Sequence, residues 1–128
     1  MLAAETLEPL RTAAAAAVDK KAFHVDGLEV TDVTSFTDAF LICSAGSPRQ
    51  VDAVAGEIGR RLAAEGRRPL HVEGTSTSEW VLLDYGDFVV HVFTEEKRSY
   101  YGLEGLWGDA PLVTAETLGI GGPQEGRG

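Results

Sequence analysis

The residues that could carry catalysis or bind a metal are few in this chain of 128 residues. It has three histidines, and His71 with Glu73 has the spacing that places two side chains on one face of a strand. A metal site needs further ligands at recognisable spacing, and no second pair supplies them. The G-x-S-x-G, H-E-x-x-H and kinase patterns do not occur either. We therefore interpret His24, His71 and His91 as structural residues, and expect neither a metal nor a cofactor.

The single cysteine, Cys43, lies in a continuous apolar run from Ala39 to Cys43. No histidine or basic residue is near it in sequence to lower the pKa of its thiol, as a nucleophile requires. One cysteine also excludes an intrachain disulfide and fits a reducing compartment. Cys43 is interpreted as a small core residue of a cytoplasmic protein.

The loop Ala45-Gly46-Ser47 precedes a helix and raises the question of nucleotide binding. A helix N-terminus with a preceding glycine can hold an anion, and a Gly-Ser pair after a strand opens the active site of nucleotidyltransferases. Those enzymes need paired carboxylates soon afterwards to hold two metal ions. The chain offers only Asp52 and Glu57, both inside the expected helix, so the transferase site is absent. A nucleotidyltransferase-like enzyme that keeps a nucleotide at Gly46-Ser47 remains the alternative hypothesis.

The segment from Glu79 to Trp107 contains both tryptophans and all three tyrosines of the chain. Two apolar runs separated by Gly86-Asp87 predict a hairpin of two strands. Regular alternation would place Trp80, Leu82 and Asp84 on one face. An aromatic, an aliphatic and an acidic residue together have the composition of a binding hot spot for an arginine- or lysine-bearing partner. The alternative is that Trp80 and Leu82 belong to the core and Asp84 to a turn.

The charge distribution also points to a basic partner. The net charge is −9, and residues 79–128 contain nine acidic and three basic side chains. Such a surface repels nucleic acid and complements a basic protein, although acidic residues also serve solubility alone. No apolar run approaches the roughly 18 residues that span a bilayer, and the N-terminal segment has no basic region typical of a signal peptide. We expect a cytoplasmic protein with little direct nucleic-acid contact and no membrane contact.

The hydrophobic periodicity predicts eight elements. The order is α-β-β-α-β-β-β-α. Thr6 is expected to cap the first helix, whose buried face is mostly alanine. The second helix is expected to begin with a capping box formed by Ser47, Pro48 and Gln50 and to end at Gly66. The strand-helix-strand segment of residues 39–72 predicts a parallel or mixed pairing with a right-handed crossover. The fold class is α/β (α+β), a mixed five-stranded sheet flanked by helices. The expected ranges are 5–21, 28–33, 39–43, 47–66, 69–72, 80–85, 88–93 and 100–107.

The composition changes after Trp107, where glycine and proline become frequent. We expect one domain over residues 1–110 and a flexible glycine-rich tail over residues 111–128.

Five motifs in order carry a family likeness. They are T-D-x-F-x-I-C-x-x-x-S-x-x-Q at residues 37–50, E-G at 73–74, W-V-L-L-D-Y-G-D at 80–87, V-H-V-F at 90–93 and Y-Y-x-L-E-x-L-W at 100–107. Together they resemble the ribosomal silencing factor family, also called the Iojap family. The resemblance covers nearly everything from residue 10 to about residue 113.

The resemblance implies a nucleotidyltransferase-like core without the catalytic carboxylates, and a function that is not enzymatic. It implies a translation repressor that binds a basic protein on the intersubunit face of the large ribosomal subunit. Bound there, it would block joining of the small subunit when nutrients are scarce. It also implies a homodimer when free, and a purely structural homodimer stays open as a third hypothesis. The positions that match the partner-binding motifs are Trp80, Leu82, Asp84, Tyr100, Tyr101, Glu104 and Trp107.

Overall fold

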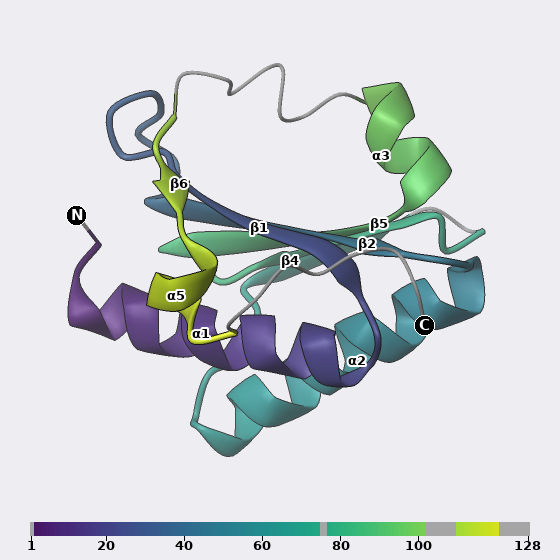
Figure 1. The fold of residues 1–128 in the computed structure, drawn as a ribbon. Coiled ribbons are helices and arrows are strands. Elements are labelled where there is room, and N and C mark those ends of the chain that lie inside the picture. The colour runs from purple at the N-terminus through teal and green to yellow at the C-terminus, as the bar shows by residue number, and fades with distance from the viewer. Residues whose placement is uncertain (1, 75–76, 102–109, 121–128) are drawn as a thin grey trace.

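The computed structural model describes residues 2–74, 77–101 and 110–120, without the side chains of residues 99–101 (Figure 1). A mixed sheet forms its middle layer, and α1 and α2 lie together on one side of it. The elements in chain order are α1 Ala4–Asp19, β1 Phe23–Glu29, β2 Ala39–Ala45, α2 Pro48–Ala64, β3 His71–Gly74, β4 Trp80–Asp84, β5 Phe88–Thr94, α3 Glu95–Tyr101, β6 Leu112–Val113 and α5 Ala115–Leu118.

The sheet has six strands in the order β3-β4-β5-β2-β1-β6, one more than expected. β2 and β5 pair in parallel, and the other four pairings among the described residues are antiparallel. The expected pairing of the third strand with β2 is wrong, because β5 takes that place and β3 lies at the far edge. β5 is a nearly continuous apolar run that suits a central strand, whereas all four residues of β3 are exposed.

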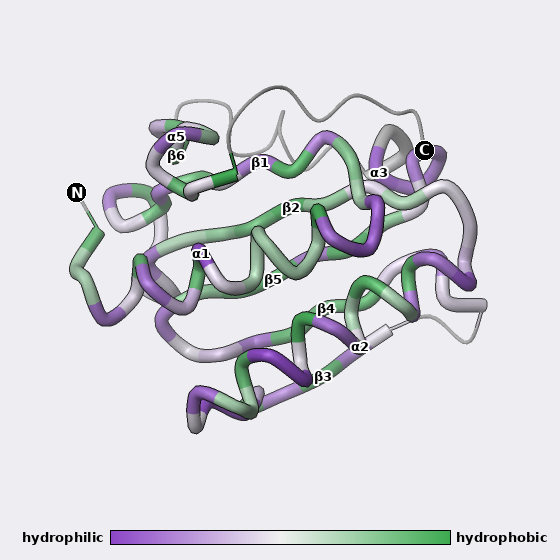
Figure 2. Tube along the Cα trace, turned by 60° about the horizontal axis from the view of Figure 1, so that its bottom comes forward, coloured by the Kyte–Doolittle hydropathy of each residue, from purple (hydrophilic) through white to green (hydrophobic). Residues whose placement is uncertain are grey.

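The first helix packs through alanine, as its sequence predicts. Ala13, Ala14, Ala16 and Ala17 are fully buried in the main core cluster. Small side chains allow α1 to lie close to α2 and to the central strands, and Figure 2 shows the two helices across the sheet with α2 on the β3 side. All seven residues of β2 are buried, which confirms it as a central strand.

Both ends of α2 follow the expected capping chemistry. The Ser47 hydroxyl accepts a hydrogen bond from the Gln50 N–H at 3.2 Å, and Pro48 opens the helix. At the other end Gly66 adopts a positive φ of 83°. The N–H groups of Gly66 and Arg67 then donate to carbonyls of the last turn, which is the Schellman arrangement. Local sequence therefore sets both boundaries of this helix.

The first helix does not have the cap that was expected. Its N-cap residue is Ala3, which has no side chain to accept a hydrogen bond. The Thr6 hydroxyl instead donates to Oδ2 of Asp87 at 3.0 Å. Thr6 is already inside the helix, and this long-range acceptor ties α1 to the turn between β4 and β5.

The first strand also begins and ends earlier than its pattern indicated. β1 covers Phe23–Glu29, and Val33 lies beyond it in a turn with 44% of its surface exposed. The residues expected to extend the strand therefore form the connection to β2.

The segment after residue 110 differs from the expected flexible tail. β6 pairs with β1, and α5 follows it and buries Leu118. Gly27 permits this pairing, because a Cβ at that position would approach Cβ of Val113 to 2.9 Å. A segment with few apolar residues can still fold there, because α1 and β1 supply the surface against which it packs. Residues 121–128 lie outside the described part.

We predict that Ser47→Ala lowers the free energy of unfolding by about 1 kcal/mol, because the Gln50 N–H loses its acceptor. Urea denaturation followed by circular dichroism measures the change. Ser47→Asp restores an acceptor and should remain within a few tenths of a kcal/mol of the original protein. Equal losses in both variants would show that the cap is not the stabilising feature.

Candidate functional site

The face of the sheet opposite α1 and α2 carries the predicted binding row. Leu83 and Tyr85 point into the core under the helices, while Trp80 packs with the smaller apolar cluster of the other face. The alternation of β4 therefore places Trp80, Leu82 and Asp84 together on this second face, as predicted. All three are half-buried. We call Trp80, Leu82 and Asp84 the hairpin row.

A stack of rings holds the first member of the row in place. The Trp80 ring lies parallel to those of His91 and Phe93 on β5, with centroids 6.2 and 5.9 Å away. Its indole N–H donates to Nδ1 of His91 at 3.2 Å. Phe40 of β2 meets the His91 ring edge-on. The rings of His91 and Phe93 therefore fix the side chain of Trp80, so this side chain loses little conformational entropy when a partner covers it.

His91 has a structural role next to the hairpin row, because it is buried and holds the Trp80 side chain. Its side chain accepts from Trp80 through Nδ1, so the neutral ring carries its proton on Nε2. Burial lowers the pKa of His91 from 6.5 to about 4, because the charged form would lose its hydration. A neutral His91 at physiological pH is what allows the Trp80 hydrogen bond. Its two-residue spacing from Phe93 was the signal in the sequence.

Asp84 has one carboxylate oxygen in a turn and one available. Oδ1 accepts from the N–H of Gly86 at 2.8 Å. Oδ2 makes no hydrogen bond or ion pair with the residues that the structure describes. Asp84 can therefore hold the turn through one oxygen and still offer the other oxygen to a basic partner.

The edge strand β3 adds two polar side chains to the same face. His71 lies opposite Asp84 and Glu73 lies opposite Leu82 in the β3–β4 pairing. His71 Nε2 and Glu73 Oε2 are 2.5 Å apart, and both side chains are more than half exposed. The imidazole and the carboxylate therefore form a hydrogen bond, and no group of three potential metal ligands occurs among the described residues.

The helix α3 begins at Glu95, five residues before the expected start at residue 100, and the rest of the expected range lies outside the described residues. It is anchored by Arg98, which no sequence pattern indicated. The guanidinium of Arg98 is 8% exposed and donates to Ser44 Oγ at 2.9 Å and to Asp26 Oδ2 at 2.6 Å. It also donates to the carbonyl oxygen of His24. These acceptors lie 54 to 74 residues away in sequence, so no local signal marks them.

The remaining predicted binding residues are on or beyond α3. Tyr100 and Tyr101 belong to α3, but their side chains are not described. Glu104 and Trp107 lie outside the described residues. All four stay predictions.

The rival chemistries lack the geometry they need within the described chain. Cys43 is fully buried, and burial raises the pKa of its thiol to about 12, which excludes a ready nucleophile. At the start of α2, the Gly46 N–H is taken by Gln50 Oε1 at 2.6 Å. Glu57, one of the two carboxylates that follow, forms ion pairs with Arg60 and Arg61. The N–H group of Gly46 is thus already hydrogen-bonded to the helix that follows it.

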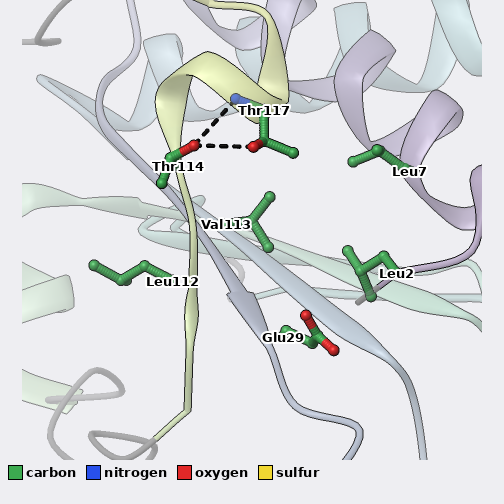
Figure 3. Close-up of a pocket in the computed structure, with 7 residues that line it drawn as sticks. All are labelled: Leu2, Leu7, Glu29, Leu112, Val113, Thr114 and Thr117. Carbon is green, nitrogen blue, oxygen red and sulfur yellow. Dashed lines mark hydrogen bonds between the residues drawn. The ribbon is translucent and has the colours of Figure 1, made fainter.

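A pocket of about 310 Å³ lies at the opposite edge of the sheet, between α1, β6 and α5 (Figure 3). Its wall is mainly aliphatic, and the Thr114 hydroxyl is occupied by Thr117 at the start of α5. No member of the hairpin row lines it. The lining residues are Leu2, Leu7, Glu29, Leu112, Val113, Thr114 and Thr117. In the described part of the chain no helix is long and apolar enough to cross a membrane.

The pKa of His91 predicts an acid-labile fold. Because the folded pKa lies below that of the unfolded chain, the contribution of His91 is complete above about pH 6.5 and is lost as the pH falls toward 4. The full shift corresponds to about 3 kcal/mol of unfolding free energy. Urea denaturation between these pH values should show a smaller pH dependence for His91→Gln than for the original protein. Equal slopes would mean that other groups cause the effect.

Comparison with known proteins agrees with the motifs. Residues 3–126 match the family described as "Ribosomal silencing factor during starvation". Ribosomal silencing factor RsfS of Bacillus subtilis is 47% identical over 104 residues, which are 81% of this chain and 88% of that protein. A crystal structure of a Chromobacterium violaceum protein matches with a TM-score of 0.76 and 34% identity, over 84% of this chain and 88% of that one.

A more distant relative is Mitochondrial assembly of ribosomal large subunit protein 1 of Mus musculus. It is 29% identical over 100 residues, which are 71% of this chain and 44% of that protein. These descriptions name ribosome-associated factors and no catalysed reaction, in agreement with the expectation that the chain is not an enzyme. The family match over nearly the whole chain, its motifs and its fold together show that this protein belongs to the ribosomal silencing factor family.

Proposed function

We propose that the protein represses translation by binding a basic protein on the intersubunit face of the large ribosomal subunit, where it blocks association with the small subunit. The observation that carries the proposal is the hairpin row, in which a tryptophan fixed by stacked rings, a half-buried leucine and a carboxylate lie side by side. One oxygen of that carboxylate has no hydrogen bond or ion pair among the residues that the structure describes. Aromatic anchors next to a charge are typical of binding hot spots.

Charge favours a basic protein over RNA as the direct partner. The net charge of −9 repels phosphate, and Glu73 adds a second exposed carboxylate beside the row. Arginine suits this surface best, because its planar guanidinium stacks on an aromatic ring and pairs with a carboxylate. Tyr100, Tyr101, Glu104 and Trp107 are proposed to extend the contact along the segment that begins with α3.

The large subunit is the proposed target for two reasons. The name of the mouse relative refers to the ribosomal large subunit, and the family description refers to starvation. A standard interface buries only about 800 Å² on each partner. One face of a small domain is therefore large enough to bind the large subunit, and the bound domain can still obstruct the surface that the small subunit would contact. We propose that silencing occurs in the cytoplasm under nutrient limitation, and that the free protein is a homodimer.

Co-sedimentation with separated ribosomal subunits, followed by a subunit-joining assay, tests the function. We expect the protein to travel with the large subunit and to reduce joining in proportion to occupancy. Retention by the small subunit, or normal joining at full occupancy of the large subunit, would contradict steric repression.

We predict that Asp84→Lys weakens binding to the large subunit by about 30-fold or more, because a paired charge is reversed at the interface. Asp84→Asn keeps an acceptor for the Gly86 N–H and removes only the charge. This variant should therefore fold normally and bind the large subunit more weakly. Asp32→Lys, an equal charge change on the β1–β2 connection, is the control and should bind normally. Unfolding of Asp84→Asn would instead make Asp84 structural.

Salt provides an independent measurement. Raising the ionic strength from about 0.05 M to about 0.5 M should increase the dissociation constant, since the contact pairs acid with base. Salt-insensitive binding would argue for an apolar contact dominated by Trp80 and Leu82.

A further inference from the structure

Helix α3 lies against the sheet through polar contacts, and none of its described side chains is apolar. These side chains are Glu95, Glu96, Lys97 and Arg98, of which Arg98 is the buried one. A helix of seven residues is too short to be stable by itself in water. The placement of α3 on the sheet therefore depends on what the buried guanidinium contacts.

The start of β1 has an irregular backbone where it meets α3. His24 has a φ of 48°, a left-handed conformation that is uncommon for a residue with a side chain. The β1–β2 register shifts between Phe23 and Asp26, and an irregularity of this kind redirects groups that a regular ladder would pair. Nη1 of Arg98 donates to the carbonyl oxygen of His24, and Nδ1 of the His24 ring lies 3.1 Å from Oε2 of Glu95. Because strained backbone persists where the surrounding structure requires it, this irregularity points to a specific role for the contact with α3.

The guanidinium of Arg98 joins α3 to two strands at once. Nη1 donates to Ser44 Oγ on β2 at 2.9 Å, and Nη2 donates to Asp26 Oδ2 on β1 at 2.6 Å. We call Arg98, His24, Asp26 and Ser44 the arginine cluster. Donors in the fixed directions of a planar group determine its orientation, and hence that of the helix that carries it. Since a buried ion pair is a weak source of net stability, the cluster is better explained by the orientation that it imposes.

The helix that the cluster orients stands beside the tryptophan end of the hairpin row. α3 follows β5 directly, since β5 ends at Thr94 and α3 begins at Glu95. Trp80 is opposite Phe93 at this end of β4, and the Thr94 N–H donates to the carbonyl oxygen of Glu79 at 2.9 Å. Figure 1 shows α3 on the side of the sheet opposite α1 and α2, which is the side of the row. The orientation of α3 therefore sets the distance between Trp80 and the residues that α3 carries.

We infer that Arg98 is a positioning residue for binding of the large subunit: it orients α3 so that Tyr100 and Tyr101 contact the same basic protein as the hairpin row. Arg98 does this without touching the partner, because its side chain is 8% exposed and its charge is paired with Asp26. An arginine exposed at this place would repel a basic protein, whereas a buried and paired one leaves the acidic surface intact. The inference rests on the proposed function and adds to it residues that lie beneath the contact surface.

Ser44→Ala gives the cleanest test, because the side chain of Ser44 is fully buried and no partner can touch it. We expect this variant to bind purified large subunits at least about fivefold more weakly, since Arg98 loses an acceptor and α3 loses its fixed orientation. Co-sedimentation over a range of subunit concentrations measures the affinity. The matched control is Thr37→Val, which removes a buried hydroxyl that has no hydrogen bond among the described residues, and it should bind normally.

A double-mutant cycle tests whether Arg98 acts through α3. Arg98→Lys keeps the charge, but one ammonium group cannot reproduce the fork that reaches both strands, so binding should weaken about tenfold. In a protein that already carries Tyr100→Ala and Tyr101→Ala, the same substitution should cost less than about twofold, because the residues that it positions are gone. In an Asp84→Asn background the tenfold effect should persist. Losses of equal size in both backgrounds would overturn the inference.

Hydrogen exchange followed by mass spectrometry separates positioning from general stabilisation. In Ser44→Ala we expect faster amide exchange in α3 and unchanged exchange in β4 and β5, because the strands keep their own pairing. Circular dichroism should show an unchanged fold at the temperature of the binding measurement. Faster exchange throughout the sheet together with normal affinity would show that the arginine cluster only stabilises the fold, and would overturn the inference.

Two further outcomes separate the inference from the function on which it rests. An original protein that binds large subunits while Ser44→Ala and Arg98→Lys bind them equally tightly would overturn the positioning role and leave the proposed repression intact. An original protein that does not bind large subunits would overturn the proposed function, and the positioning role with it.

Discussion

The parallel pairing of β2 with β5 determines where the other elements of the fold can lie. Seven consecutive residue pairs join the two strands, and both are almost fully buried. A parallel pair needs a long connection, and here α2, β3 and β4 all lie within it. The connection therefore places β3 and β4 on one side of the central pair and leaves β1 and β6 on the other. α1 and α2 then cover one face.

The candidate site follows from what that cover leaves open. Trp80 faces Phe93 across the β4–β5 pairing, and Leu82 faces His91. The hairpin row is consequently supported by side chains of a nearly fully buried strand, while its own side chains reach the surface. A rigid support beneath a half-exposed aromatic is an efficient way to build affinity from a small area, because the anchor is already ordered before binding.

Features that depend on local pattern and chemistry could be predicted from the amino-acid sequence. It predicted the buried run of β2, the capping box and glycine closure of α2, the hairpin, and the shared face of Trp80, Leu82 and Asp84, because periodicity and caps act over a few residues. Tertiary structure alone decided that β5 rather than β3 lies beside β2, that Thr6 bonds to Asp87 and that Arg98 reaches β1 and β2. It also ordered β6 and α5 where composition favoured a tail. Those outcomes depend on which surfaces remain to be covered after the core has formed, and no local signal carries that information.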